Sequence, residues 1–240
     1  MNDNKSTQHR PAKAPVIDLF SKQSLQPGDE QRLLRICPEL DDISMLYSND
    51  AHAGKVFKLR LIAWGLQKNG DIVGLVPWLN SVTACPTLTD PLNGHWEGYY
   101  DGLSGEVFYD ALPHKAIELQ AAYDYFCEHH PYSSQNAEID PVIQEIPDQI
   151  GTHAVFNHTD QNTFFVTAVF SWQLRQQGLV EGMLIDPAKV EKTPVLAGDD
   201  SLYPVSSSPG FKYFFQYAIA NKIKNQDPDA LKAMSAIIKC

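Results

Sequence analysis

The chain of 240 residues is long enough for one large domain or two small ones, and its 43% hydrophobic and 20% charged content is an ordinary globular composition. Its formal net charge of −10 and isoelectric point near 5.2 argue against non-specific binding to nucleic acid, which needs clustered Lys and Arg. No apolar run approaches the roughly 18 residues that span a bilayer, and residues 1–15 lack the apolar core of a signal peptide. We therefore expect a cytoplasmic protein with no nucleic-acid or membrane partner.

The sequence lacks the common catalytic and nucleotide-binding motifs, which excludes the simplest catalytic assignments. The sequence has no GxxxxGK[ST], GxGxxG, GxSxG or HExxH pattern. Its four cysteines are scattered without a CxxC pair, which favours reduced structural thiols over a zinc or redox site: Cys37, Cys85, Cys127 and Cys240. No metal site is predicted, and no cofactor is identified.

The acidity is concentrated in one region of the chain. Residues 86–160 hold 13 Asp or Glu and a single basic residue, Lys115, whereas the rest of the chain is close to neutral. A solvated face that keeps the protein soluble accounts for this pattern. The alternative is a docking surface for a basic protein partner, because opposite potentials speed and orient an encounter.

In chain order, residues 1–15 have no periodicity and predict a flexible tail. The apolar segment VIDLF at residues 16–20 predicts an edge strand or a helix packed on the core. This segment also resembles the Leu-Phe-ended peptides that dock on the bacterial sliding clamp, without their usual leading glutamine.

Apolar residues at helical spacing then predict two short helices between residues 27 and 47, the second beginning at Pro38.

Residues 55–79 predict a β-hairpin, because Asn69-Gly70 between two apolar runs favours a two-residue type I′ turn. That register places Gly65 opposite Gly74. Two facing glycines leave bare backbone, which either lets a helix pack closely or admits a small-molecule ligand. In the ligand interpretation the binding residues are Gly65, Gly74, Trp64 and Trp78.

A polar aromatic stretch, HWEGYYD, occupies residues 95–101. In an extended chain, alternation places His95, Glu97, Tyr99 and Asp101 on one face. An imidazole and two carboxylates within reach could hold a divalent cation or act as general acid and base. His95, Glu97 and Asp101 are therefore candidate catalytic residues, although a half-exposed edge strand explains the same pattern.

The remaining chain predicts a helix, a second strand-rich block and two more helices. The first helix runs from Leu112 to about His130, and strands follow between residues 153 and 185. The aromatic segment from Phe211 predicts a helix, with Ser207 and Ser208 either capping it or forming an anion site at its N-terminus. Asp227-Pro228 predicts the start of a final helix, and no repeat of 20 to 50 residues is apparent.

Two strand-rich blocks, 55–110 and 150–185, with helices around them predict an α+β fold with a mainly antiparallel, bent sheet and helices on a face or end. We expect one domain over residues 16–240 behind the tail 1–15. The first functional hypothesis is a non-catalytic binding protein whose acidic surface, within residues 86–160, faces a basic partner. The alternatives are a metal-assisted or acid/base hydrolase using His95, Glu97 and Asp101, and a small-molecule-binding domain; the oligomeric state stays open.

Overall fold

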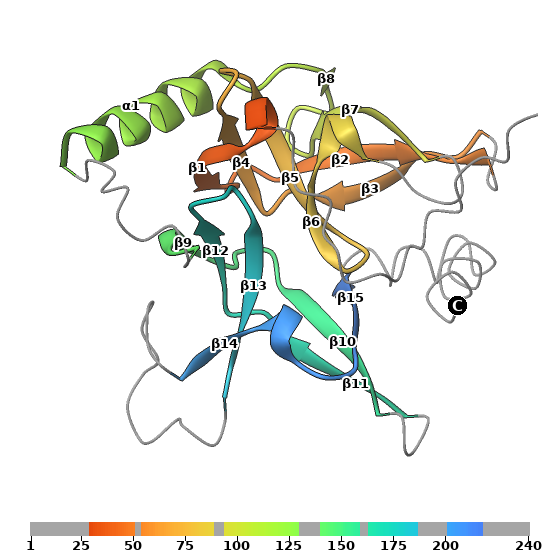
Figure 1. Ribbon diagram of the computed structural model, residues 1–240. Coiled ribbons are helices and arrows are strands. Elements are labelled where there is room, and N and C mark those ends of the chain that lie inside the picture. The colour runs from red at the N-terminus through yellow and green to blue at the C-terminus, as the bar shows by residue number, and fades with distance from the viewer. Residues whose placement is uncertain are drawn as a thin grey trace, which may run out of the picture.

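The computed structural model describes residues 29–50, 54–88, 94–129, 140–158, 163–186 and 201–217. This part of the chain is mostly β, with four small antiparallel sheets and one α-helix, α1 (Pro113–His129). The sheets lie around the molecule in an arrangement like that of a four-bladed β-propeller (Figure 1). The prediction of an α+β fold is therefore wrong.

Each sheet is built from strands that are not all consecutive in the chain. Sheet A has the order β1 (Leu33–Pro38), β4 (Ala63–Gln67), β5 (Ile72–Trp78), β6 (Ser81–Ala84). Sheet B has the order β3 (Phe57–Arg60), β2 (Ile43–Ser48), β7 (His95–Asp101), β8 (Val107–Phe108). Sheet C has the order β14 (Leu202–Pro204), β13 (Val180–Ile185), β12 (Ser171–Arg175), β9 (Val142–Pro147). Sheet D has the order β11 (Thr163–Ala168), β10 (Thr152–His158), β15 (Phe211–Gln216).

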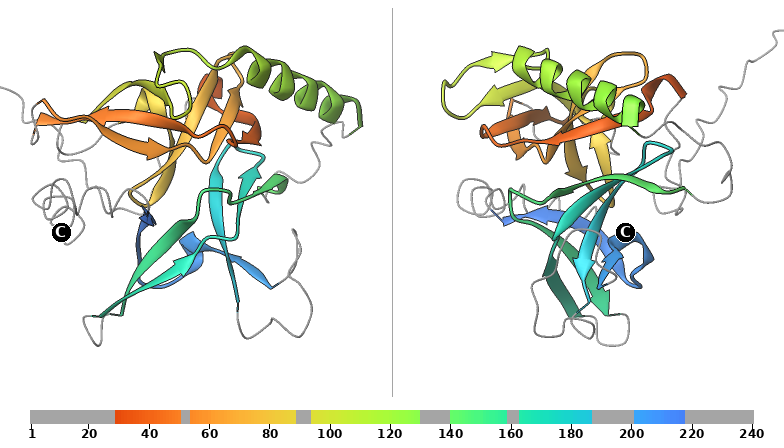
Figure 2. Two further views of the ribbon diagram at one scale, coloured as in Figure 1. Left: turned by 180° about the vertical axis from the view of Figure 1, so that it is seen from behind. Right: turned by 90° about the vertical axis from the view of Figure 1, so that its left-hand side faces the viewer.

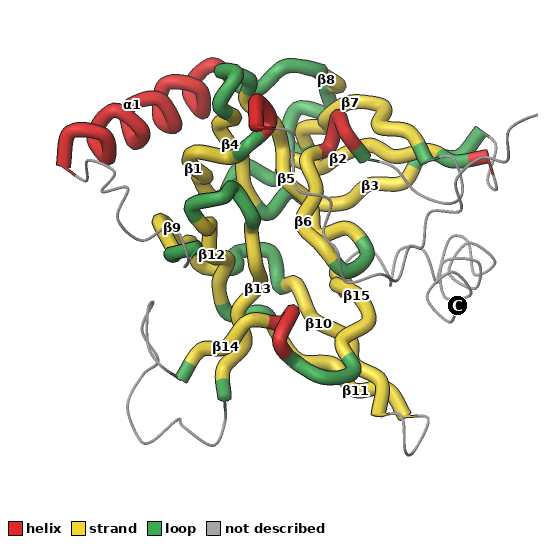
Figure 3. The backbone as a smooth tube through the Cα atoms, in the orientation of Figure 1, coloured by secondary structure: helices red, strands yellow, loops and turns green. Residues whose placement is uncertain are grey.

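The two halves of the chain, residues 29–129 and 140–217, repeat the same order of elements. In each half a lone strand of one sheet (β1 or β9) precedes a hairpin of the other sheet (β2–β3 or β10–β11). Three strands of the first sheet follow, then a short 3-10 segment, η3 (Cys85–Thr87) or η4 (Val205–Ser207), and then β7 or β15 (Figure 3). Sheets A and B in the first half thus correspond to sheets C and D in the second.

The correspondence extends to irregularities of strand pairing. The pairings of β1 with β4 and of β9 with β12 each contain a β-bulge, in which one residue has no partner across the strands: Leu34 in β1 and Ile143 in β9. The pairings of β2 with β7 and of β10 with β15 do the same at Glu97 and Lys212. Because bulges bend strands at defined places, their recurrence at matching positions indicates an internal structural duplication.

A short sequence motif marks the duplication. The pattern W-x-L-x3-G-x3-G occurs at residues 64–74 and again, roughly 110 residues later, at residues 172–182. Its tryptophans are fully buried in both halves, and each indole N–H donates to a carboxylate: Trp64 to Glu39, and Trp172 to Asp148 at 2.9 Å. A buried indole N–H usually has a hydrogen-bond partner, and at these matching positions both halves of the fold supply a carboxylate as that partner.

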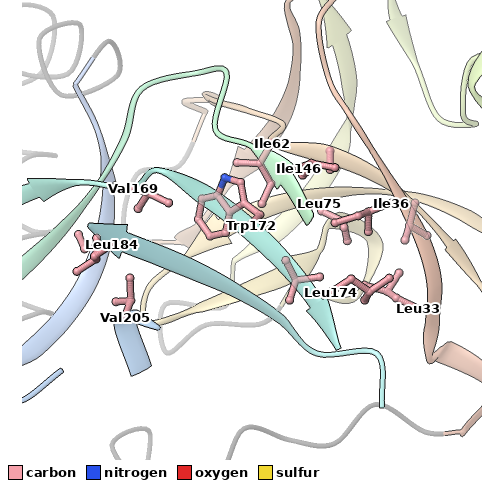
Figure 4. Packing of buried hydrophobic residues seen from close by; sticks show 14 of the residues in the cluster. Leu33, Ile36, Ile62, Leu75, Ile146, Val169, Trp172, Leu174, Leu184 and Val205 are labelled. Carbon is pink, nitrogen blue, oxygen red and sulfur yellow. The ribbon is translucent and has the colours of Figure 1, made fainter. Parts of the chain in front are cut away.

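The two cores differ in where their residues come from. The first core lies between sheets A and B, and all of its buried residues belong to the first half; they include Met45, Trp64, Tyr99 and Leu119. The second core combines residues of sheets C and D, such as Trp172 and Leu174, with Leu33, Ile36 and Leu75 of sheet A (Figure 4). The first half therefore completes the core of the second.

The predicted helices between residues 27 and 47 are strands β1 and β2. Nearly every residue of these strands is buried, and a short, uniformly apolar run does not distinguish a strand from a helix by periodicity. The predicted helix from Phe211 is also a strand, β15, as its aromatic residues favour. The helix predicted from Leu112 is confirmed as α1.

The predicted hairpin exists, but its register is wrong. Gly70, at φ 91°, ends a three-residue turn in which its N–H donates to the carbonyl of Gln67, so Trp64 rather than Gly65 lies opposite Gly74. The predicted strand before the turn is two strands, β3 and β4, because the chain crosses from sheet B to sheet A at Leu61 and Ile62. The tail 1–15, the segment 16–20 and the helix predicted from Pro228 lie outside the described residues.

Candidate interaction surface

The predicted catalytic patch lies on β7, an inner strand of sheet B that pairs with β2 on one side and with β8 on the other. Glu97 is the residue left over by the bulge, and Gly98 there has φ 115°. The bulge interrupts strict alternation, so Tyr99 is buried in the first core, where its ring lies 4.8 Å from that of Trp64. The expected common face of His95, Glu97, Tyr99 and Asp101 is therefore wrong with respect to Tyr99.

The polar side chains of this patch are engaged with neighbouring strands and turns. Glu97 accepts a hydrogen bond from the Ser48 hydroxyl at 2.5 Å. Asp101 accepts hydrogen bonds from the Leu103 N–H and the Ser104 hydroxyl, and these, the first above all, lower the pKa of Asp101 below its ordinary value of 3.8. Within the described residues no three His, Cys, Asp or Glu side chains are grouped so as to hold a metal ion. The hydrolase interpretation stays a prediction.

The space beside the two hairpin glycines is filled by apolar side chains. A Cβ on Gly65 would lie 2.6 Å from Leu33, and one on Gly74 would lie 2.6 Å from Tyr99, whose hydroxyl accepts a hydrogen bond from the Gly74 N–H. Trp64 is fully buried, and the ring of Trp78 packs 4.8 Å from that of Tyr47. These glycines allow Leu33 and Tyr99 to pack closely against the backbone, so the space beside them is not a gap for a ligand. The small-molecule interpretation stays a prediction.

The serines before Phe211 do not precede a helix. Ser207 lies at the end of η4, and its hydroxyl donates to the Pro204 carbonyl at 2.8 Å, while Ser208 donates to the same carbonyl at 3.5 Å. Because β15 follows, neither the predicted cap nor the anion site at a helix N-terminus has the helix that it requires.

Helix α1 lies along sheet A and contributes little of its surface to the core. Only Lys115 and Leu119 are buried, and the Arg35 guanidinium of β1 lies 3.4 Å from the centre of the Phe126 ring. The Lys115 ammonium lies 3.6 Å from Asp41 and 3.9 Å from Glu118. Lys115, the one Lys or Arg of the helix, is thus buried and paired, and its charge does not face the exposed side.

The exposed side of α1 and the neighbouring β7–β8 turn combine carboxylates with large apolar side chains. Ile117 is 72% exposed and Tyr125 is 62% exposed, although residues of this kind are usually buried. β8 and α1 follow the same edge of the molecule in three orientations (Figures 1 and 2). We call this region, residues 103–128, the acidic edge. Its exposed carboxylates and large apolar side chains are Glu106, Asp110, Glu118, Asp124, Glu128, Leu103, Val107, Tyr109, Ile117 and Tyr125.

Comparisons with known proteins provide no functional assignment. The chain matches no protein-family model, and comparison with curated proteins and with solved structures gives no significant match. Within the described part of the chain, no helix has both the length and the apolar composition to cross a membrane.

The sequence indicated the acidic part of this surface, but the apolar part was missed. In the helix, Ala116, Leu119 and Tyr123 are spaced three and four residues apart and share one side, and Ile117 and Tyr125 fall on the opposite side. That spacing was the available signal, since two large apolar residues two turns apart on the opposite side of a helix are exposed unless another element covers them.

Proposed function

We propose that this protein is a non-catalytic binding protein whose acidic edge docks a basic protein partner in the cytoplasm. The observation that carries the proposal is the exposure of Ile117 and Tyr125 among carboxylates, in a region whose one Lys or Arg, Lys115, is buried. Interfaces combine aromatic or aliphatic anchors with a polar rim, and the charge of that rim selects the partner. A basic partner with apolar pockets fits both features.

The cytoplasmic part of the proposal is supported by the cysteines. Cys37 and Cys85 are free and buried, and Cys127 is free and exposed. An unpaired exposed thiol suits a reducing compartment, because oxidising compartments favour disulfides. The first-half core also uses its two buried cysteines as small apolar side chains.

Capture by the immobilised full chain tests the proposal when wild type is compared with two pairs of variants. Ile117→Ser with Tyr125→Ser removes the apolar anchors, and Asp124→Lys with Glu128→Lys reverses two exposed charges. Matched controls place the same kinds of change elsewhere on the described surface: Val56→Ser for the apolar change, and Glu30→Lys with Asp71→Lys for the charges.

We expect the retained protein to be basic, and its retention to fall at least tenfold with the anchor variant, since truncation of a central anchor costs about 2 kcal/mol or more. The charge variant should slow association and flatten the salt dependence of binding. Both control variants should retain the partner as wild type does. Retention that is unchanged in the anchor variant, or a retained protein that is acidic, would contradict the proposal.

A further inference from the structure

Sheet D presents an apolar outer face, on the side away from the second core. Ala154 and Phe156 of β10 point into that core, so alternation directs Val155 and its cross-strand partner Val166 outward, although Val155 itself is only 4% exposed. Phe164 is 46% exposed, Val166 is 42% exposed and Tyr217, just after β15, is 49% exposed. Unlike the acidic edge, this face carries no carboxylate among its described residues, which include His153, Val155, Val166, Ala168, Tyr213 and Phe215.

The matching face of sheet B is polar. The Lys58 ammonium lies 3.1 Å from the centre of the Tyr100 ring, and Arg60 forms an ion pair with Asp42 at 3.1 Å. The bulge and the strand pairing of the two halves place Val166 at the position of Lys58, and Ala168 at that of Arg60. Sheet B therefore has charged side chains, suited to contact with water, at positions where sheet D has apolar ones. Exposed apolar patches mark contacts with another segment or molecule.

Directly after β15, beside the outer face of sheet D, the chain continues into residues 218–240, whose sequence has apolar residues at regular spacing. The Tyr217 ring lies 4.6 Å from that of His153 and 4.9 Å from that of Phe215, so the chain leaves β15 against the outer face. Residues 218–240, which the structure does not describe, carry a copy of the α1 pattern. With Tyr99 matched to Phe214, the residues Pro113, Ala116, Leu119 and Tyr123 of α1 correspond to Pro228, Leu231, Met234 and Ile238.

The place that α1 occupies in the first half is already filled in the second. α1 packs on β1 and β4, and Arg35 of β1 contacts its Phe126. In the second half β1 packs on the matching strands β9 and β12, and Gln144, which matches Arg35, bonds to the Ile36 N–H at 2.9 Å. A second copy of α1 must therefore bury its apolar side on a different surface.

We propose that residues 228–239 form the counterpart of α1 and cover the outer face of sheet D. The apolar residues of this segment recur at helical spacing, and the face beside its point of departure has Val166 and Ala168 at the positions of Lys58 and Arg60 in sheet B. Docking removes Phe164, Val166 and Tyr217 from water.

Hydrogen exchange of the full chain tests this docking with a matched pair of variants. Ile238→Asp places a charge on the apolar side of the predicted helix, and Ala236→Asp places the same charge on its opposite side. We expect Ile238→Asp to speed amide exchange in β11 and β15 on the order of tenfold, because their protection then depends on local opening alone. Ala236→Asp should leave exchange at the wild-type rate, as should exchange in β2 and β7 for both variants.

A cross-link from the chain's own terminal thiol identifies what covers the face. In a Cys127→Ser chain, whose other described thiols, Cys37 and Cys85, are buried, a benzophenone attached to Cys240 should join peptides from residues 153–168 or 211–217 of the same molecule. Cross-links confined to the first half would overturn the proposal. So would cross-links between chains with protection that rises with protein concentration, which would show a second copy on this face. Equal exchange rates in Ile238→Asp and wild type would also overturn it.

Discussion

The two halves of this protein share one fold and differ in how each core is closed. In the first half α1 supplies Leu119 to the core between sheets A and B, and every buried residue of that core lies before residue 120. In the second half no described helix plays this part, and sheet A supplies Leu33, Ile36 and Leu75 instead. A duplicated fold can thus be closed by an appended helix or by its own neighbour, and the second solution makes one half depend on the other.

Separating the halves is the most severe way to test this dependence. We expect residues 29–139 to unfold cooperatively on heating, whereas residues 140–240 alone should lack a fixed tertiary structure. The second core would lose six buried apolar residues of the first half. Five of them are Leu, Ile or Val, each worth up to about 1.5 to 3 kcal/mol, against a usual net stability of about 5 to 15 kcal/mol. Circular dichroism and NMR spectra of each piece make the measurement. Cooperative unfolding of residues 140–240 alone would refute the dependence.

The two tryptophan–carboxylate pairs sharpen the comparison within the intact chain. Glu39→Ala and Asp148→Ala each leave a buried indole N–H without its acceptor, and each should cost about 1 to 3 kcal/mol of unfolding free energy. Glu39→Ala should speed hydrogen exchange in both halves, while Asp148→Ala should do so in sheets C and D alone.

Replacing the donor controls for this interpretation. In a Trp172→Phe background no indole N–H needs an acceptor, so Asp148→Ala should then cost less than in wild type. The Thr152 N–H, which donates to Asp148 at 2.8 Å, accounts for the remaining cost. Equal costs in the two backgrounds would mean that the indole bond does not stabilise the second half.

The turn glycines of the repeated motif give a smaller, matched contrast. Gly70 and Gly178 have φ values of 91° and 88°, so alanine is strained at both. A Cβ on Gly70 meets open space, whereas one on Gly178 would lie 2.7 Å from the backbone nitrogen of Leu33. Chemical denaturation should show a cost of about 1 kcal/mol for Gly70→Ala and about 2 to 3 kcal/mol for Gly178→Ala. Similar costs would show that the contact between the halves tolerates movement.

The sequence could predict those elements that local rules decide. The Asn69-Gly70 turn and the apolar spacing from Leu112 specify a hairpin and a helix, and both are present. Nearly every residue of strands β1 and β2 is buried, so their apolar residues show no strand periodicity, and the sequence predicts helices there. For β1 that burial comes from α1, β9 and β12, which lie far from it in the sequence. The α+β prediction was wrong for this reason.

The duplication explains what else could not be read locally. Its period is roughly 110 residues, beyond the 20 to 50 residues of ordinary repeats, and the motif shared by residues 64–74 and 172–182 is sparse. The acidic composition of residues 86–160 indicated a candidate surface, but composition alone does not show that Ile117 and Tyr125 are exposed within it. That exposure depends on which side of α1 faces sheet A.

Cysteines in the first core should produce the smallest effect, and one that depends on pH. Cys37 corresponds to the buried Ile146, so Cys37→Val should change stability at pH 7 by less than about 1 kcal/mol. Burial above all, with the charge of Glu118 second, raises the pKa of the Cys37 thiol from 9.0 to about 12.

The sign of the pH dependence follows from that shift. Below pH 9 the thiol is neutral in both the folded and the unfolded chain, so the folded state keeps its full stability. Between pH 9 and 12 only the unfolded chain ionises, and stability should fall by up to about 1.4 kcal/mol per pH unit for this group. Urea titrations across this range should show a shallower fall for Cys37→Val than for wild type. An equal fall in both would mean that the Cys37 thiol reaches water in the folded state, and that α1 does not keep solvent out of this part of the first core.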